Sequence, residues 1–353
     1  MSRIIKYFKA LNEAVDQAMA KDPSVYIMGL GVPDPRGIFG STSGLQEKYG
    51  AKRVFDMPTA ENGMTGIAIG SALAGMRPIM THQRIDFALL AMEQMVNQAA
   101  NWHYMFGGQM KVPLVVRMIV GRGWGQGPQH SQSLQAWFAH VPGLKVVMPA
   151  TPYDAKGLLI ASIEDNNPVI FIEHRWLYNI EGEVPDEVYR VPLGKAKLVK
   201  EGKDLTIAAV SYMTLEALRV AEILEKQNIG ADVIDVRTLK PLDEEAILNS
   251  VKKTGRLVVL DTGWRTGGFA GEIVACVAEK NMKYLKSAPV RITLPDIPAP
   301  TSPALANRYY PRAVHILQAI EKMLDIKIEQ LEELEKEDTI PHDVPDKSFT
   351  GPF

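Results

Sequence analysis

The sequence lacks the features that mark several classes of protein: it has few cysteines, no large excess of charge of one sign and no long apolar run. Its only cysteine, Cys276, rules out an internal disulfide framework and a cysteine-based zinc site. The 39 Lys and Arg residues nearly balance the 41 Asp and Glu residues, so the net charge of -2 gives no electrostatic footprint for nucleic acid or an anionic membrane. No apolar run reaches the roughly 20 residues that span a bilayer. We therefore expect small molecules and proteins as partners, no nucleic acid, no membrane, and a cytoplasmic location.

Several short catalytic motifs are also missing. The sequence has no P-loop, no G-x-S-x-G elbow, no H-E-x-x-H and no paired-histidine metal spacing. The stretch "GRGWGQGPQHSQ" (121–132) spaces its glycines as G-x-G-x-G-x-G, whereas the dinucleotide fingerprint is G-x-G-x-x-G with an acid about 20 residues on. A nicotinamide site is therefore not expected.

What is present predicts a two-domain α/β protein. A length of 353 residues exceeds the usual single core, and 46% hydrophobic residues can fill two. Strand and helix patterns alternate, which predicts for each domain a mostly parallel sheet with helices on both faces. The predicted divisions are a first domain over 1–180, a linker over 181–200, a second domain over 201–325 and a charged, Pro-rich tail over 326–353.

Predicted elements follow from the spacing of apolar residues. Helices are expected at 4–20, 88–105, 152–165, 213–228, 243–253 and 268–280. Strands are expected at 25–31, 111–121, 168–174, 204–211, 231–237, 256–262 and 289–294.

Glu61 lies in "PTAENGMTGIAIGSALAGMRP" (58–78), a stretch made mostly of small and apolar residues. One interpretation is structural: Thr59 caps the helix and the helix dipole stabilises Glu61 in the first turn. The other is chemical, because small residues at Gly66, Gly70 and Ala74 let a helix or a bound ring pack closely along that face. The residues alone leave both open.

Two further segments carry polar side chains at candidate ligand positions. "THQRIDF" (81–87) places His82, Arg84 and Phe87 at the carboxyl end of a strand, where ligands bind in open α/β sheets, although a salt-bridged surface loop fits equally well. In the glycine-rich segment, Gln129 and His130 follow a backbone that allows close approach, and a capping or core role for His130 is the alternative.

The order of three motifs resembles one family. "RVFDMPTAENGMTGIAIGSALAGMRP", "QHSQSLQAWFAHVPGLKVVMPATPYDAKGLLIASIEDNNPVIFIEH" and "VIDVRTLKPLDEEAI" are together similar to the β subunit of the thiamine-diphosphate-dependent E1 component of 2-oxo acid dehydrogenase complexes (pyruvate dehydrogenase E1 β type). The resemblance spans roughly residues 5–324. It implies a transketolase-like pyrimidine-binding domain followed by a transketolase C-terminal-like domain.

The resemblance also implies roles for particular residues. Glu61 would hydrogen-bond the cofactor's aminopyrimidine, Phe87 would stack on that ring, and His130 would lie near the reacting carbon; Glu61 and His130 are thus the candidate catalytic residues. His82, Arg84 and Gln129 are substrate-pocket candidates. Some relatives hold potassium with main-chain oxygens, at positions that match here Leu114, Ser162, Asp165 and Asn167.

The family's G-D-G…N motif for magnesium and diphosphate is missing from this chain. The resemblance therefore implies an α subunit that supplies Mg2+ binding, in an α2β2 heterotetramer, with a lipoyl-bearing E2 core as a further partner. The segment Thr81, His82, Gln83, Arg84 departs from the family pattern, which suggests an altered substrate pocket. Alternatives are an acetoin-cleaving or ketol-transferring enzyme subunit, or a non-catalytic assembly partner.

Overall fold

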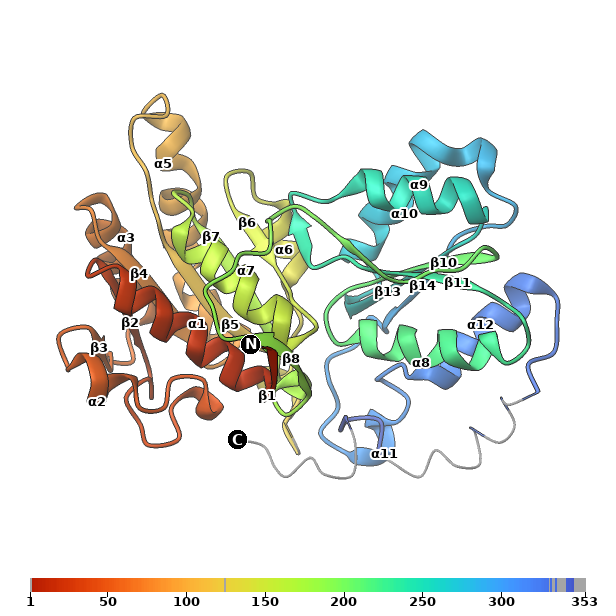
Figure 1. Cartoon of the computed structure of the whole chain (residues 1–353), viewed down its shortest axis with the longest axis horizontal. Coiled ribbons are helices and arrows are strands. Elements are labelled where there is room, and N and C mark those ends of the chain that lie inside the picture. Colours follow the sequence, from red (N-terminus) through yellow and green to blue (C-terminus); the bar gives the residue numbers. More distant parts are fainter. Residues whose placement is uncertain (1, 124, 330, 332–333, 335–340, 346–353) are drawn as a thin grey trace.

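The computed structural model describes residues 2–123, 125–329, 331, 334 and 341–345. These residues form two large sheets of mostly parallel strands, side by side and flanked by helices, with a small strand pair beside the first sheet (Figure 1). The predicted two-domain α/β class is confirmed. Within the described residues, no helix is long and apolar enough to cross a membrane.

The first part of the chain contains these elements: β1 (Ser2–Lys6), α1 (Tyr7–Lys21), β2 (Val25–Gly29), α2 (Leu45–Tyr49), β3 (Val54–Phe55), α3 (Glu61–Leu73), β4 (Arg77–His82), α4 (Ile85–Ala88), α5 (Ala100–Met105), β5 (Val115–Val120), α6 (Gln135–His140), β6 (Lys145–Val147), α7 (Pro152–Glu164), β7 (Val169–His174) and β8 (Glu181–Pro185). The second part contains β9 (Lys197–Lys200), β10 (Leu205–Ala209), α8 (Met213–Glu225), β11 (Ala231–Asp235), β12 (Thr238–Lys240), α9 (Glu244–Thr254), β13 (Leu257–Trp264), α10 (Phe269–Asn281), β14 (Val290–Leu294), α11 (Pro303–Ala306) and α12 (Ala313–Leu324).

The first sheet has the strand order β12-β6-β7-β5-β4-β2-β3, and only β12 runs antiparallel to its neighbour. Strands β2, β5 and β7 are buried along their whole length, as continuous apolar runs in a parallel sheet require. Helices α1 and α7 cover one face, and α3 with the segment 94–100 covers the other. Helix α7 begins where expected, because the Thr151 side chain accepts a hydrogen bond from Asp154 N at 3.1 Å and Pro152 takes the first helical position.

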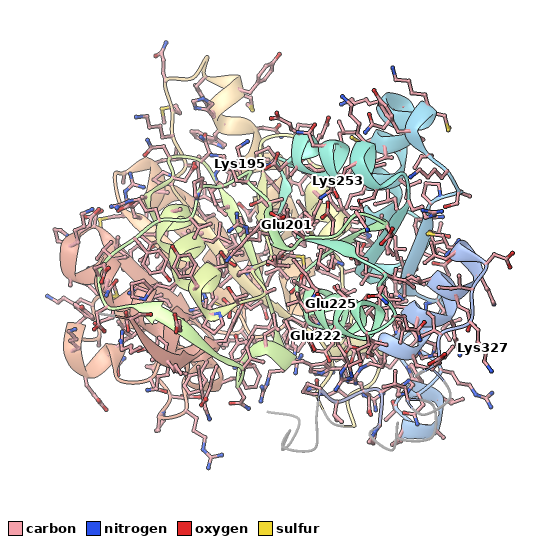
Figure 2. All side chains as sticks on the ribbon, turned by 45° about the vertical axis from the view of Figure 1, so that its right-hand side comes forward. Lys195, Glu201, Glu222, Glu225, Lys253 and Lys327 are labelled. Atoms are coloured by element: carbon pink, nitrogen blue, oxygen red, sulfur yellow. The ribbon has the colours of Figure 1, made fainter. Side chains whose placement is uncertain are left out.

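The second sheet has the order β14-β13-β10-β11-β9, with β9 antiparallel at one edge. Its helices α9 and α10 lie above it and α8 lies below it in Figure 1. This part of the molecule carries charged side chains of both signs, among them Lys195, Glu201, Glu222 and Lys253, which are labelled in Figure 2. Cys276 is buried in α10, as predicted.

Several predicted elements differ from the observed ones. The helix expected from residue 4 begins at Tyr7, because residues 2–6 form β1 and pair antiparallel with β8. The helix expected over 88–105 is divided into α4, a tight turn at 89–91, a wide π turn at 94–99 and α5. Within the predicted linker, β8 and β9 are strands, and residues 238–240 join the first sheet as β12.

The two sheets share their hydrophobic cores. One cluster of buried side chains continues from α1 and α7 to α8 and α12, and another continues from α3 to α9 and α10. A buried ion pair also joins the two parts: Arg237, after β11, lies 2.8 Å from Asp154 of α7. The molecule is therefore held together by continuous packing as well as by the chain connection.

Candidate functional site

The carboxyl ends of β2, β4, β5 and β7 meet at one edge of the first sheet, the lower edge in Figure 1. In parallel α/β sheets this edge is where ligands bind, because loops and helix starts converge there. The predicted segments around Glu61, His82 and His130 all follow strands that end at this edge.

Glu61 is the first residue of α3 and is only 5% exposed. The helix N-cap is Ala60, which makes no side-chain hydrogen bond, so the expectation that Thr59 caps this helix is wrong. Glu61 instead begins the buried face of α3, followed by Thr65, whose hydroxyl is buried and lacks a hydrogen-bond partner. Among the described residues, none forms a hydrogen bond or ion pair with the Glu61 carboxylate. The Glu61 side chain is thus largely covered, and a ligand at this edge could supply the donor that its carboxylate lacks.

Phe87 and His130 come together although 43 positions separate them. Their ring centroids lie 5.5 Å apart in an edge-to-face arrangement with an interplanar angle of 85°. The segments that carry them are tied by Asp86, which accepts a hydrogen bond from Gln132 Nε2 at 2.9 Å. Burial raises the pKa of Asp86. Gln129 lies beside His130 on the same short turn and is exposed.

His82 and Arg84 are 2% and 3% exposed, so the interpretation of "THQRIDF" as a salt-bridged surface loop is wrong. Neither ring nitrogen of His82 has a hydrogen-bond partner, and burial lowers its pKa to about 4, which keeps the ring neutral at pH 7. Arg84 donates a hydrogen bond to the Gly121 carbonyl, at the start of the glycine-rich segment. Burial and the nearby Arg175 lower the pKa of Arg84 to about 10.

The sequence analysis did not identify the residues at the carboxyl end of β7 as candidates for this site. His174 is buried, and burial together with Arg84 lowers its pKa to about 3. The Arg175 guanidinium lies 4.6 Å from the ring centroid of Phe39 and faces a cavity of about 540 Å³ that Gln83 and Asn179 also line. The signal was available, because "PVIFIEH" ends at the carboxyl edge just as "THQRIDF" does.

The loop around Phe39 is strained. Ile38 and Phe39 have φ values of 35° and 55°, in the left-handed region that non-glycine residues rarely adopt. Such backbone strain persists only where the surroundings hold it, and it clusters at ligand sites.

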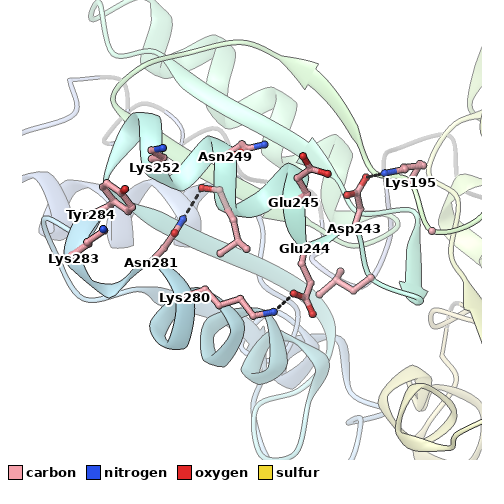
Figure 3. Close-up of a pocket in the computed structure, with 13 residues that line it drawn as sticks. Lys195, Asp243, Glu244, Glu245, Asn249, Lys252, Lys280, Asn281, Lys283 and Tyr284 are labelled. Carbon is pink, nitrogen blue, oxygen red and sulfur yellow. Dashed lines mark hydrogen bonds and ion pairs between the residues drawn. The ribbon is translucent and has the colours of Figure 1, made fainter.

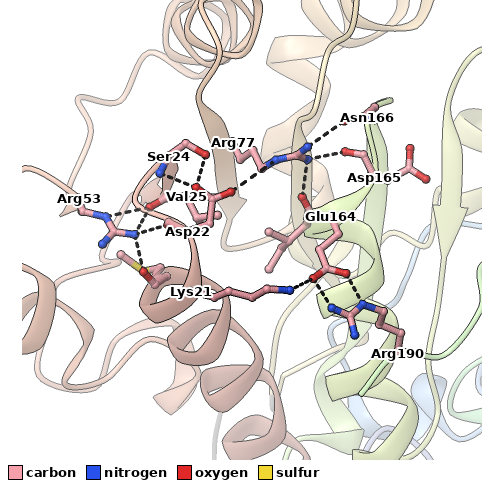
Figure 4. A network of polar contacts seen from close by, with 12 residues as sticks. Lys21, Asp22, Ser24, Val25, Arg53, Arg77, Glu164, Asp165, Asn166 and Arg190 are labelled. Carbon is pink, nitrogen blue, oxygen red and sulfur yellow. Dashed lines mark hydrogen bonds and ion pairs between the residues drawn. The ribbon is translucent and has the colours of Figure 1, made fainter. Parts of the chain in front are cut away.

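The residues matching the potassium positions lie near the opposite, amino edge of the sheet. The Leu114 carbonyl accepts a hydrogen bond from Val169 N at 2.9 Å, and the Ser162 carbonyl accepts one from Asp165 N at 3.3 Å. The Asp165 carbonyl accepts a hydrogen bond from Arg77 at 3.0 Å, and Figure 4 shows this guanidinium reaching the loop after α7. Asn167 N donates to the Asp165 carboxylate at 2.8 Å. Three of the four carbonyls thus have one hydrogen bond each, and each keeps a second lone pair.

A wide concavity of about 720 Å³ lies between α9 and α10 of the second sheet. Figure 3 shows two ion pairs among its charged residues, Lys195 with Asp243 and Lys280 with Glu244. Glu245, Lys252 and Lys283, which also line it, are exposed to solvent, so their charges need no ligand to compensate them. We therefore place the candidate site at the carboxyl edge of the first sheet.

No group of three or more His, Cys, Asp or Glu side chains suited to a metal ion occurs among the described residues. Most of the predicted tail, 326–353, lies outside the described residues. Residues 341–345 are described, and they pack against this chain: Asp343 pairs with Arg122, which precedes the glycine-rich turn.

The fold and this site define a two-domain α/β protein with a ligand site at the carboxyl edge of its first sheet. Residues 4–181 match the model for the transketolase pyrimidine-binding domain, and residues 194–316 match that for the transketolase C-terminal domain. The chain belongs to this transketolase-like family, within the group of 2-oxo acid dehydrogenase E1 β-type subunits.

Two curated relatives illustrate the group. The β subunit of acetoin:2,6-dichlorophenolindophenol oxidoreductase from Cupriavidus necator is 44% identical over 334 residues, covering 92% of this chain and 98% of the relative. The pyruvate dehydrogenase E1 component subunit β from Rickettsia bellii is 42% identical over 320 residues, covering 90% of this chain and 98% of the relative. A solved structure described as a split-gene transketolase, inactive β4 tetramer, has the same fold with a TM-score of 0.75, 24% identity, and coverage of 92% of this chain and 99% of that chain.

Proposed function

We propose that this chain is the β subunit of a thiamine-diphosphate-dependent 2-oxo acid dehydrogenase, active only with an α subunit. The observation that carries the proposal is Glu61: this residue is only 5% exposed and lies at the ligand-binding edge, and its carboxylate has no hydrogen-bond donor among the described residues. A ligand that brings an N–H or a protonated ring nitrogen to this carboxylate would satisfy it, and the aminopyrimidine of thiamine diphosphate is such a ligand.

When bound, thiamine diphosphate supplies the nucleophilic carbon that adds to a 2-oxo acid and carries the fragment left after CO2 departs. Glu61 would hold a proton at the pyrimidine ring nitrogen, and its apolar surroundings would strengthen that hydrogen bond. Phe87 would pack on the pyrimidine ring, and His130, held against Phe87, would stabilise charge or move a proton at the substrate oxygen. Gln129 would reach the substrate from the same turn.

His82 and Arg84 fit a supporting role better than direct contact with a charged substrate. The His82 ring is neutral at pH 7, and Arg84 is bonded to the Gly121 carbonyl. We propose that they shape the pocket wall by fixing the ends of β4 and β5.

We propose that the α subunit supplies the part of the site that the described residues lack. They offer no metal-ligating cluster, so Mg2+ and the diphosphate would be bound mainly by an α subunit, in an α2β2 assembly. A lipoyl-bearing core is the proposed acceptor of the acyl fragment. The single buried cysteine fits the reducing environment of the cytoplasm, where we place the protein.

We also propose potassium at the carbonyls of Leu114, Ser162, Asp165 and Asn167, beside Arg77. If it binds there, the unfolding midpoint will rise in KCl relative to NaCl at equal ionic strength. Equal midpoints would argue against the ion.

Glu61→Gln tests the central assignment. The amide keeps the shape of the side chain but is a weaker acceptor, so turnover with the α subunit should fall at least about a hundredfold while assembly is retained. Glu47→Gln, a change of the same kind at an exposed position on α2, should leave turnover unchanged. Full activity of Glu61→Gln would refute the role of Glu61.

Acetoin cleavage is the second candidate, favoured by two relatives of that name that are 44% and 42% identical. A panel of pyruvate, branched 2-oxo acids and acetoin, with dichlorophenolindophenol as electron acceptor, distinguishes the two reactions. If Arg84 shapes the pocket, Arg84→Ala will change the ranking of these substrates, and an unchanged ranking removes that argument.

A non-catalytic partner would show no thiamine diphosphate binding by calorimetry with Mg2+ and the α subunit present.

A further inference from the structure

Residues 341–345, here called the C-terminal strap, are packed into the body of the chain. Asp343 is 1% exposed, and Val344 is 8% exposed. Arg312, just before α12, donates hydrogen bonds to the Val344 carbonyl at 2.8 Å and to the Pro345 carbonyl at 3.2 Å. The strap lies beyond residue 316, where the match to the family's C-terminal domain ends.

Arg122 is the point where the strap meets the candidate site. Its guanidinium is fully buried and lies 3.1 Å from the Asp343 carboxylate. The same guanidinium donates to the carbonyls of Pro300 and Thr301, the latter at 2.6 Å. Its own main-chain carbonyl accepts a hydrogen bond from Trp176 Nε1 at 2.7 Å. Arg122 therefore joins three segments: the strap, the loop at 300–301 and the turn after β7.

The loop at 300–301 in turn packs closely against the glycine-rich segment. A Cβ atom on Gly127 would lie 2.5 Å from the Thr301 hydroxyl, so these two residues are in close contact. Three residues after Gly127 comes His130, whose ring packs on Phe87. A continuous set of contacts thus runs from Asp343 through Arg122 and Thr301 to the turn that carries His130.

We propose that Asp343 is a positioning residue for His130. Its carboxylate neutralises the buried Arg122 guanidinium, which keeps Arg122 on the Pro300 and Thr301 carbonyls and so keeps the glycine-rich segment in place. Without that carboxylate the guanidinium is a buried charge lacking its counter-ion, and it will move toward water or admit water. Either change loosens the segment that holds His130. The catalytic consequence rests on the proposed function, whereas the structural coupling does not.

Hydrogen exchange on the full-length chain tests the coupling without any activity assay. In Asp343→Asn, amide exchange in peptides covering 121–131 and 300–302 should rise about tenfold or more. Asp296→Asn is the matched control, because Asp296 is exposed and accepts hydrogen bonds from Thr266 in the neighbouring loop; it should leave these peptides unchanged. Unchanged exchange in Asp343→Asn, or an equal rise in Asp296→Asn, would overturn the proposal.

Two further variants separate positioning from a general loss of structure. Asp343→Glu keeps the charge and should restore most of the protection, whereas Val344→Ser loosens the strap without stranding a charge and should give a smaller rise. With the α subunit, Asp343→Asn should lower kcat about tenfold and leave KM within about twofold, because His130 acts at the reacting centre. Increased exchange with an unchanged kcat would overturn the positioning role. An inactive wild-type pair would instead count against the proposed function and leave the exchange result to decide the coupling.

Discussion

At the scale of single residues, several polar groups around the candidate site are kept away from water by the fold. The two histidines at the ends of β4 and β7 are the clearest case. Burial lowers the pKa of His82 to about 4, and burial with Arg84 lowers that of His174 to about 3. Both are therefore neutral in the folded chain down to pH values at which an unfolded chain binds protons.

This difference predicts a pH dependence of stability. Between the ordinary histidine pKa of 6.5 and the lowered value, the unfolded state binds more protons than the folded one, so stability is lost as pH falls. For His82 alone, the loss between pH 7.5 and pH 5 should be about 2 kcal/mol. Urea unfolding of the wild type and of His82→Phe at both pH values measures it, and the variant should lose less stability by that amount.

His140→Phe is the control for this experiment, because His140 is exposed at the end of α6. Its replacement should leave the pH dependence of the wild type intact. If His82→Phe and the wild type lose equal stability between the two pH values, His82 does not titrate as its burial requires.

The sequence identified Glu61, Phe87 and His130 as candidates, and the structure places Phe87 and His130 in contact. That contact was predictable only through the family resemblance, because the spacing of two loops along the chain does not determine their distance. Arg175 was missed because it follows the strand directly, where it resembles a helix-start residue rather than a pocket residue. Asp343 was missed because a buried ion pair between distant segments leaves no local pattern.

At the scale of elements, helix α3 combines a buried face, polar only at its start, with an exposed one. Gly70 is exposed on the outer side, and a Cβ atom there would meet nothing within 4 Å. Ile67, on the same side, is 58% exposed. The small residues were predicted to allow close packing, but in the single chain no other segment packs against this side of the helix at Gly70.

Glycine replacements distinguish positions where glycine is dispensable from those where it is required. Gly70→Ala should raise the free energy of unfolding by about 0.5–1 kcal/mol, because alanine restricts the unfolded chain and fits the helix. Gly143→Ala should lower it by at least about 2 kcal/mol, since Gly143 has a φ of 90° and a Cβ atom would lie 2.0 Å from the Ala100 carbonyl. Chemical unfolding of both variants checks the pair; changes of the same sign would contradict it.

Strands and helices of the two sheets were largely predictable, because buried parallel strands are continuous apolar runs flanked by turn residues. The strands that were missed have one physical cause, which is pairing between segments far apart in the sequence. Residues 2–6 are a strand because β8 pairs with them, although their local pattern continues into a helix. Residues 238–240 are a strand because β6 offers an unpaired edge.

At the scale of the whole molecule, the shared cores predict one cooperative unfolding transition. Because both hydrophobic clusters cross from one sheet to the other, neither part keeps its core when the other unfolds. Calorimetry should show a single peak. Two well-separated peaks would mean that the parts are thermodynamically independent.

Arg237→Met probes the same connection. The change strands the Asp154 carboxylate, which is fully buried, and should destabilise the whole chain by about 3–5 kcal/mol while keeping a single transition. Arg190→Met is a suitable comparison, because the Arg190 pair with Glu164 is solvent-exposed and should cost no more than about 1 kcal/mol. Equal effects of the two changes would argue that the Arg237 pair contributes no more than a surface contact.

Strand β12 also has a consequence for biosynthesis. All the other strands of the first sheet are synthesised before residues 238–240. The nascent chain therefore emerges from the ribosome with β6 as an unpaired edge of the sheet. Unpaired edges recruit other chains, and they do so most readily while a protein is incompletely folded. Stalled or truncated products that end before residue 238 should therefore aggregate, and the interval between synthesis of β6 and synthesis of β12 is when this protein most needs a chaperone.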